Sequence, residues 1–217
     1  MCKIILLIVV LFPAILFGQS TKKVTDKDKH EVYYVLKSDK TIRQGSYNKS
    51  GWNGKPLIDG YYKNGMKDSI WTFYDNSGQV NQKYDYVKKE FIFEKADTAG
   101  SNDLWPVIKG SDTIKTKLDK HPNYIGGSNV LYQFLADNLD YPDSAKDLNK
   151  MGTVKIIFTV DKNGKAINHR VIQHVYPCLD REAMRVVKLL PNEWEPAILN
   201  GEKVDASYTL PIRFVLR

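Results

Sequence analysis

The residues with the best spacing for chemistry are His174, Cys178 and Asp180. A histidine and a cysteine four residues apart could form a thiolate–imidazole pair or half of a metal site if both lay on one helix. Pro177 lies between them and places Cys178 at the start of a helix, where a small apolar residue packs against a sheet. We therefore interpret Cys178 as a core residue.

The remaining candidates for catalysis are weaker. His30, His121 and His169 are isolated in the sequence, and no spacing of histidines and carboxylates fits a zinc motif. The chain has neither a nucleophile elbow nor a phosphate loop, and Gly126 with Gly127 is typical of a turn before a helix. The sequence thus predicts no catalytic residue, metal or cofactor and indicates a protein that is not an enzyme.

Residues 204–216 alternate apolar and polar side chains, which predicts a half-buried strand. Pro211 cannot donate to a ladder, so we expect this strand to border its sheet and to offer a free edge to a partner's extended segment. The expected partner-binding residues are Tyr208, Thr209, Leu210, Pro211, Ile212, Arg213 and Phe214.

Length and charge limit the other classes of function. The 217 residues suffice for one ordinary domain or two small ones, and the net charge is +7. The basic pairs, Lys22 with Lys23 and Lys88 with Lys89, are too short to follow a phosphate backbone. Nucleic acid is therefore not an expected partner.

The amino terminus predicts export. Lys3 precedes an apolar stretch over residues 4–17 that is interrupted by Pro13 and closed by a polar sequence. This stretch is shorter than the ~20 residues of a spanning helix, so a signal peptide over residues 1–19, cleaved between Gly18 and Ser20, is favoured over a retained anchor. Cys178 would then be the one cysteine left, which excludes an internal disulfide.

Residues 32–95 are rich in tyrosine, glycine and turn signals and predict short strands. The segments IRQGSYNKSGWNGK and LIDGYYKNGMKDSIWTFYDNSG form an imperfect repeat that resembles MORN-type repeats of β-hairpins. Two interpretations stay open for its aromatic residues, a core with cross-strand pairs or a surface for a ligand or glycan. These residues are Tyr61, Trp71, Phe73 and Tyr74. The polar residues 96–120 that follow predict a linker.

Residues 121–217 predict the order helix, helix, strand, strand, helix, strand, and therefore an α+β fold with an antiparallel sheet. Ser128 is expected to cap the first helix, and Ala145 and Leu148 are expected to face inward from the second. The run GTVKIIFTVDKNGKA predicts a hairpin. The third helix has Asp180 near its start and Lys188 near its end, as the helix dipole favours.

Four segments in this order resemble the C-terminal domain of TonB as found in Bacteroidetes-type energy transducers. They are PNYIGGSNVLYQFLADNLDYPDSA, GTVKIIFTVDKNGKA, LDREAMRVVKLLPNEWEPAILNG and YTLPIRF, within residues 122–216. The resemblance implies a periplasmic α+β domain that adds a segment of a TonB-dependent outer-membrane receptor to its sheet as a further strand. The partner would be such a receptor or another envelope protein.

The chain departs from the transducer pattern in two respects. Its nine prolines are scattered and form no proline-rich spacer, and its apolar leader is short. We therefore expect receptor binding in the periplasm and leave energy coupling open. The alternatives are an inner-membrane-anchored transducer that retains its leader, and an envelope scaffold protein that self-associates through its last strand.

Overall fold

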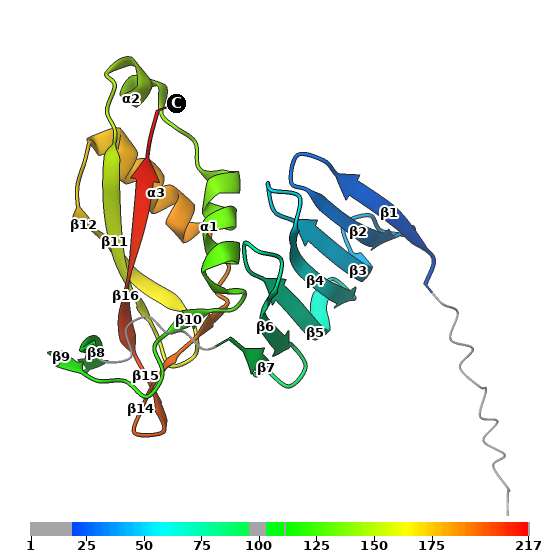
Figure 1. Ribbon diagram of the computed structural model, residues 1–217, viewed down its shortest axis with the longest axis horizontal. Helices are drawn as coiled ribbons and strands as arrows, with labels where there is room; N and C mark the ends of the chain where they lie inside the picture. Colours follow the sequence, from blue (N-terminus) through cyan, green and yellow to red (C-terminus); the bar gives the residue numbers. More distant parts are fainter. Residues whose placement is uncertain (1–18, 96–102, 111, 217) are drawn as a thin grey trace, which may run out of the picture.

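A computed structural model describes residues 19–95, 103–110 and 112–216 of the chain. Figure 1 shows an all-β sheet on one side and a mixed part with helices and a second sheet on the other. The chain as a whole is α+β with antiparallel sheets, as the sequence predicts. The predicted signal peptide falls almost wholly on residues 1–18, which lie outside the described residues.

The first part is a meander of seven antiparallel strands in chain order. The strands are β1 (Thr21–Asp26), β2 (Glu31–Leu36), β3 (Arg43–Ser50), β4 (Pro56–Lys63), β5 (Met66–Tyr74), β6 (Val80–Asp85) and β7 (Glu90–Glu94). Short turns join them, and left-handed residues such as Asn64 and Gly65 make the β4–β5 turn. The sheet begins earlier than the repeat, because β1 already starts at Thr21.

Aromatic side chains form the core of the meander. Trp71 and Phe73 are both 1% exposed, and Trp71 stacks on Tyr47 with a centroid separation of 5.4 Å. Tyr61 is 43% exposed. The two interpretations of the repeat aromatics therefore divide by residue: Trp71 and Phe73 are core, and Tyr61 faces solvent.

The second part contains three helices and a five-stranded antiparallel sheet. The helices are α1 (Gly127–Asn138), α2 (Asp143–Asp147) and α3 (Pro177–Lys188). The sheet has the order β12-β11-β16-β8-β9, from strands β8 (Trp105–Lys109), β9 (Asp112–Thr116), β11 (Gly152–Val160), β12 (Ala166–Gln173) and β16 (Ala206–Phe214). The short strands are β10 (Asn123–Tyr124), β13 (Trp194–Glu195), β14 (Ala197–Leu199) and β15 (Glu202–Val204).

The core of this part lies where α1 and α3 pack against β11 and β16. Val154, Ile156, Leu179 and Leu210 are fully buried in it. The amphipathic helices and the alternating strands bury their apolar faces together, as their periodicities require. All six predicted elements are present in the predicted order.

Two details of the helices differ from the prediction. Gly126 in the left-handed region, and not Ser128, precedes α1, and its amide is bound by the Gln82 side chain at 2.7 Å. A Cβ at Gly126 would crowd Val130, so glycine is needed there. Leu148 is 54% exposed because α2 ends at Asp147, which leaves Ala145 as the buried residue of that helix.

The segment predicted as a linker, residues 96–120, contains regular structure. Strands β8 and β9 form a hairpin across five residue pairs, and β8 joins the C-terminal sheet through the pair Val107 and Ala206. Val107 and Ala206 are both fully buried, with Leu118 and Ala197 in the same cluster. A linker without structure is therefore wrong for residues 105–109 and 112–116, because β8 buries Val107 against β16 and β9 pairs with β8 along its whole length.

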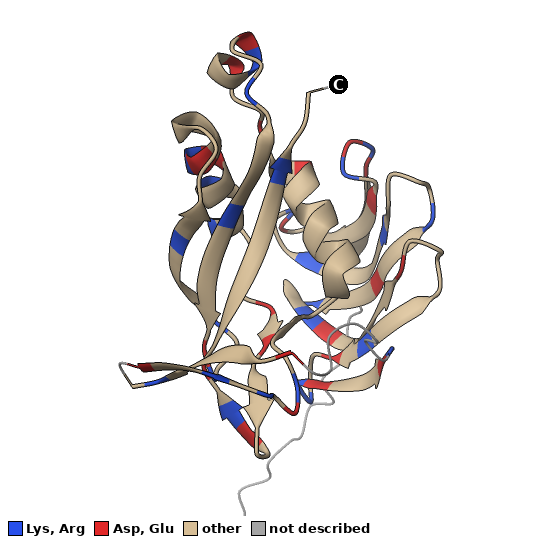
Figure 2. Cartoon of the chain, turned by 60° about the vertical axis from the view of Figure 1, so that its left-hand side comes forward, with Lys and Arg blue, Asp and Glu red and all other residues tan. Residues whose placement is uncertain are grey.

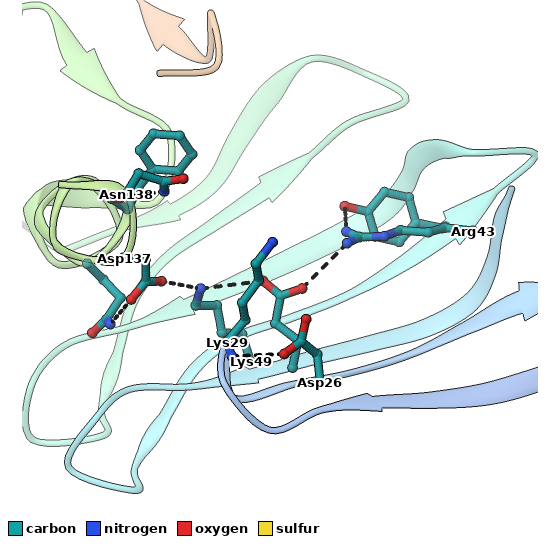
Figure 3. A network of polar contacts seen from close by, with 10 residues as sticks. Asp26, Lys29, Arg43, Lys49, Asp137 and Asn138 are labelled. Carbon is teal, nitrogen blue, oxygen red and sulfur yellow. Dashed lines mark hydrogen bonds and ion pairs between the residues drawn. The ribbon is translucent and has the colours of Figure 1, made fainter. Parts of the chain in front are cut away.

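The two parts are in contact through Ile125, which packs into the meander core, and through polar side chains. Figure 1 shows α1 between the two sheets, and Figure 3 shows Lys49 of β3 reaching Asp137 of α1 at 2.7 Å. Lys49 also pairs with Glu31, which in turn pairs with Arg43, at 3.4 Å in each case. This network ties the meander to the first helix.

A second set of polar contacts joins the meander to Glu193, the residue before β13. Lys67 Nζ contacts both carboxylate oxygens of Glu193 at 2.7 and 2.6 Å, and the Tyr86 hydroxyl donates to the same carboxylate at 3.0 Å. Burial lowers the pKa of Lys67, and the attraction of Glu193 offsets only part of that effect. Lys120 pairs with Glu94 at 2.8 Å close by.

Candidate functional site

The strand β16 does not border its sheet. It pairs with β11 over nine residue pairs, from Ala206 opposite Val160 to Phe214 opposite Gly152, and it pairs with β8 on its other side. The prediction that this strand borders its sheet is therefore wrong. The hairpin β8–β9, which lies in the segment predicted as a linker, occupies the border in its place.

The ladder between β16 and β8 is short. Within the described residues it comprises the single pair Ala206 and Val107, beside which the Ile108 amide donates to the Asp205 carbonyl at 2.8 Å. Figure 1 shows β8 beside the beginning of β16, while the rest of β16 continues past it. Among the described residues, no strand pairs with β16 on the side away from β11 between Thr209 and Arg213, and this stretch is its open edge.

Alternation along the strand shows which main-chain groups face this opening. The carbonyls of Asp205 and Ser207 both point toward β8, since they accept from Ile108 and from the Trp105 indole. In an antiparallel ladder every second residue directs its main-chain groups to the same side. Thr209, Pro211 and Arg213 therefore present theirs to the open edge.

This geometry explains the proline inside β16. Pro211 stands opposite Lys155 of β11, but its missing N–H would have faced away from β11. A proline is tolerated in a strand where no neighbouring strand would accept a hydrogen bond from its main-chain nitrogen. Pro211 thus marks an open edge without placing the whole strand at the border.

The side chains of β16 divide by face. Leu210, Ile212 and Phe214 are at most 3% exposed and hold the strand on the core. Tyr208 is half-buried and stacks on Phe158 at a centroid separation of 5.6 Å. Of the seven expected residues, only Thr209, Pro211 and Arg213 are exposed.

Residues 137–216 match the family model described as Gram-negative bacterial TonB protein C-terminal. The match supports the TonB C-terminal family for this segment. It extends from the end of α1 to the end of β16 and so contains the open edge, whereas the meander and the hairpin β8–β9 lie outside it. Neither the curated proteins nor the solved structures gave a match to the chain.

The TonB C-terminal family is a transport-associated module of the cell envelope without enzymatic activity. His174 pairs with Asp180 in this segment and does not form a thiolate–imidazole pair with Cys178. His174 Nδ1 lies 2.8 Å from Asp180 Oδ2, and Cys178 is 8% exposed in the core. Asp180 also accepts the Val175 amide at 3.0 Å, so the carboxylate fixes the start of α3. This arrangement confirms Cys178 as a core residue.

The described residues contain no cluster of three histidines, cysteines or carboxylates that could hold a metal ion. Nor does any helix among them have the length and apolarity to cross a membrane. Figure 2 shows basic and acidic residues interspersed over both sheets and the helices of the TonB-matched segment.

Trp105 and Ser207 also lie at this edge, although the sequence does not predict their contact. Trp105 donates its indole N–H to the Ser207 carbonyl at 2.6 Å across 102 residues of sequence. The available local signal was WPVIKGSDTIKT, in which two short β-prone runs flank a turn at Gly110. That signal predicts a hairpin, but not its pairing with the last strand of the TonB-matched segment.

Proposed function

We propose that the C-terminal part of the chain is a periplasmic protein-binding module that takes up an extended segment of a TonB-dependent outer-membrane receptor beside β16. The observation that carries this proposal is the open edge from Thr209 to Arg213, which lies inside the TonB-matched segment. Main-chain hydrogen bonds to an added strand provide affinity, and neighbouring side chains provide specificity.

The charge of the edge indicates the chemistry of the partner. Arg213 is exposed next to the open main-chain groups, so it favours a segment with an acidic or polar residue at that position. Leu210, Ile212 and Phe214 are buried and serve the fold of the module instead. The binding residues proper are therefore Thr209, Pro211 and Arg213.

The proposal is tested by NMR on the ¹⁵N-labelled protein with a short peptide from the periplasmic segment of a receptor encoded in the same genome. We expect shifts confined to residues 204–216. Thr209→Pro removes an open amide without removing a bond to β11 and should abolish these shifts. Thr209→Val keeps the amide and the branched shape and should preserve them.

A charge reversal gives an independent test. Arg213→Glu should weaken binding of an acidic peptide several-fold, with a smaller effect at high salt, because the residue is exposed. Shifts in the meander instead of β16, or equal binding by the Thr209→Pro protein, would exclude strand addition at this edge.

We further propose that export removes residues 1–19 and releases the protein into the periplasm. The position of β1 supports this, because cleavage before Ser20 leaves β1 whole from its first residue, Thr21. Mass spectrometry of the mature amino terminus tests it. Recovery of intact residues 1–20 in the membrane fraction would favour the anchored energy transducer.

A second candidate is a scaffold protein of the envelope that self-associates through β16 and binds a partner with its meander. The exposed apolar side chains of the meander favour this candidate, with Met66 71% and Val87 67% exposed. Light scattering of wild type and Thr209→Pro separates the two. A dimer that becomes monomeric in the variant would support the scaffold.

A further inference from the structure

Each segment of the imperfect repeat contains one tryptophan, and the two tryptophans have different surroundings. Trp71 is 1% exposed in the meander core, whereas Trp52 is 59% exposed in the loop between β3 and β4. Trp52 therefore contributes little to the core. Its side chain instead lines a pocket of about 210 Å³.

The pocket lies where two turns of the meander meet helix α1, which Figure 1 shows next to the meander. Its polar and aromatic lining residues are Trp52 and Asn53 of the β3–β4 loop, Asp75 and Asn76 of the β5–β6 turn, and Asn129 and Gln133 of α1. The two residues of α1 are four apart and so share one face of the helix. All six precede residue 137, so the pocket lies outside the TonB-matched segment.

Hydrogen bonds hold the two turns and the helix in place around the pocket. Asn53 Oδ1 accepts the Lys55 amide at 3.0 Å, and Asn53 Nδ2 donates to the Asn76 carbonyl at 3.2 Å, which links the two turns. Asn129 Nδ2 donates to the Tyr74 carbonyl at 3.3 Å and joins α1 to the end of β5. The pocket is therefore formed before a ligand binds, which reduces the entropy cost of binding.

The amide side chains of the pocket keep unused hydrogen-bonding capacity. A side-chain amide has two N–H donors and an oxygen that can accept twice. Gln133 Nε2 donates to Asp137 Oδ1 at 2.8 Å, which uses one of its two donors. Gln133 Oε1 lies beside the β3–β4 loop, since a Cβ at Gly51 would be 3.9 Å from it. Among the described residues, neither Gln133 Oε1 nor Asn129 Oδ1 accepts a hydrogen bond.

The pocket has no unpaired charge that would select an ionic ligand. Asp75 is the one charged residue among the described residues that line it. Asp75 Oδ1 accepts the amides of Ser77 and Gln79 at 2.9 and 3.0 Å, and Asp75 Oδ2 pairs with Lys95 at 3.1 Å. The carboxylate is thus engaged within the protein, and the pocket favours a neutral ligand.

We propose that this pocket binds one ring of a neutral saccharide, an activity separate from strand addition at β16. A pyranose with equatorial hydroxyls has a flat face of C–H groups, which packs on the apolar face of an indole. Its hydroxyls both donate and accept, so they match the unused groups of Asn129 and Gln133. The volume lies below the ~300 Å³ of the smallest pockets for drug-sized ligands, so it suits a single ring.

A proline-rich peptide is the main alternative ligand, because such segments also pack on aromatic side chains. The grooves that take these peptides are lined by aromatic rings. Trp52 is the one aromatic residue among the described residues that line this pocket, and most of its polar neighbours are amides. The lining therefore favours a ligand with many hydroxyl groups.

The test is an NMR titration of the ¹⁵N-labelled protein with methyl β-glucoside and with methyl β-N-acetylglucosaminide. We expect at least one of them to cause saturable shifts of the Trp52 indole N–H and of the Asn129 and Gln133 side-chain amides. The dissociation constant should be on the order of 1 mM, because a small ligand makes few contacts. Glycerol has hydroxyls but no flat apolar face and should cause no such shifts.

Trp52→Ala removes the stacking surface and should weaken binding about tenfold or more, whereas Trp52→Tyr keeps an aromatic face and should bind nearly as the wild type does. Because Trp52 is exposed, the urea midpoint of both variants should stay near that of the wild type. Gln133→Leu keeps the size of the side chain and should weaken binding about threefold to tenfold.

Two further variants are matched controls that should bind the glycoside as the wild type does. Tyr61→Ala removes another exposed aromatic side chain of the meander, 43% exposed and outside the pocket. Thr209→Pro alters the edge of β16, so wild-type glycoside binding by this variant separates the pocket from strand addition. A failure of strand addition would leave the saccharide site standing.

Four results would overturn the proposal. They are the absence of saturable shifts with both glycosides, equal shifts with glycerol, glycoside binding by Trp52→Ala that matches the wild type, and loss of binding in Tyr61→Ala. Shifts of the pocket signals by a capped oligoproline peptide, without shifts by either glycoside, would replace the saccharide with a peptide ligand.

Discussion

At the scale of single residues, glycine and tryptophan of the repeat act as one packing unit. Gly60 lies on β4 beneath the Trp71 ring, and a Cβ at this position would overlap the indole carbons. Trp71 cannot move aside, because it is 1% exposed and stacks against Tyr47. The glycine of the repeat is therefore required for space.

This packing predicts the effect of Gly60→Ala. The methyl group should destabilise the protein by about 2 to 3 kcal/mol through overpacking, measured by urea unfolding. Gly54→Ala is the control, since Gly54 has φ +75° and open space around it. It should cost only about 1 kcal/mol from backbone strain. A Gly60→Ala cost no larger than that of the control would contradict the packing argument.

A second residue-scale prediction concerns acid stability. Glu182 accepts two hydrogen bonds from Arg185, at 2.6 and 2.7 Å, and the Asp140 amide at 2.7 Å. Burial opposes ionisation of Glu182, but these bonds outweigh it and lower the pKa of the carboxyl from its ordinary value of 4.5. The unfolded state then binds more protons below pH 4.5, so stability present above this pH is lost as the pH falls through the folded pKa.

Glu182→Gln should make the free energy of unfolding less dependent on pH below pH 4.5. At neutral pH it should cost about 1 to 3 kcal/mol, because Arg185 loses the carboxylate of Glu182 as a charged partner. Urea unfolding between neutral pH and pH 3 measures both effects. If the free energy of unfolding fell with pH below pH 4.5 as steeply in the variant as in the wild type, other carboxyls would control acid unfolding. Asp143→Asn is the comparison: Lys146 also lowers the pKa of the Asp143 carboxyl, but this pair is exposed and screened by solvent, so the change should alter acid stability less.

At the scale of elements, local periodicity was sufficient for helices α1 and α3 and for the β11–β12 hairpin, because each carries its pattern within one short window. It was insufficient for the neighbours of β16. The contact between Trp105 and Ser207 spans 102 residues, and no local pattern encodes such a pairing. Pro211 correctly indicated that one side of the strand lacks a pairing partner at that residue. It could not show that β8 pairs with the beginning of the same side.

The hairpin β8–β9 yields an element-scale prediction. A linker would be cut readily by proteases, whereas residues 105–109 and 112–116 should resist cleavage because β8 is anchored through fully buried Val107. Val107→Asp places a charge in that cluster and should cost about 3 kcal/mol or more. It should release the hairpin, so that proteolysis there and exchange of the Ile108 amide become fast.

Ile114→Asp is the control for this change, because Ile114 lies on the neighbouring strand and is 38% exposed. It should leave both rates near those of the wild type. Rapid cutting of the wild type within β8 or β9 would restore the linker interpretation of this segment.

At the scale of the whole molecule, the sequence suggested two units and the structure joins them. Apart from Ile125, which packs into the meander core, the contacts are made by scattered charged and polar residues, Lys49 with Asp137 and Lys67 with Glu193 among them. Isolated charges in a sequence are indistinguishable from solvated surface residues, since nothing local marks their distant partners. The binding edge thus belongs to a body that includes the meander.

The pair Lys67 and Glu193 tests how this docking is stabilised. The side chains are 22% and 23% exposed, and the ammonium also lies 4.7 Å from the Trp71 ring centroid. A partly buried ion pair gains little net stability, but removing one partner leaves the other charge desolvated. Lys67→Met should therefore cost about 2 to 4 kcal/mol, and Glu193→Gln should cost less, since Gln can still accept from Tyr86.

The double variant should be more stable than the sum of the single changes predicts, by a coupling of about 1 to 3 kcal/mol, in urea unfolding at neutral pH. Amide hydrogen exchange should locate the effect. In Lys67→Met, protection from exchange should be lost in β13 and at the Ile125 amide, which donates to the Glu193 carbonyl. Additive costs would show that the pair does not couple the two parts. In that case the contact between the two parts would depend on the apolar packing of Ile125 in the meander core. The pair Lys67 and Glu193 would then only orient the two parts relative to each other.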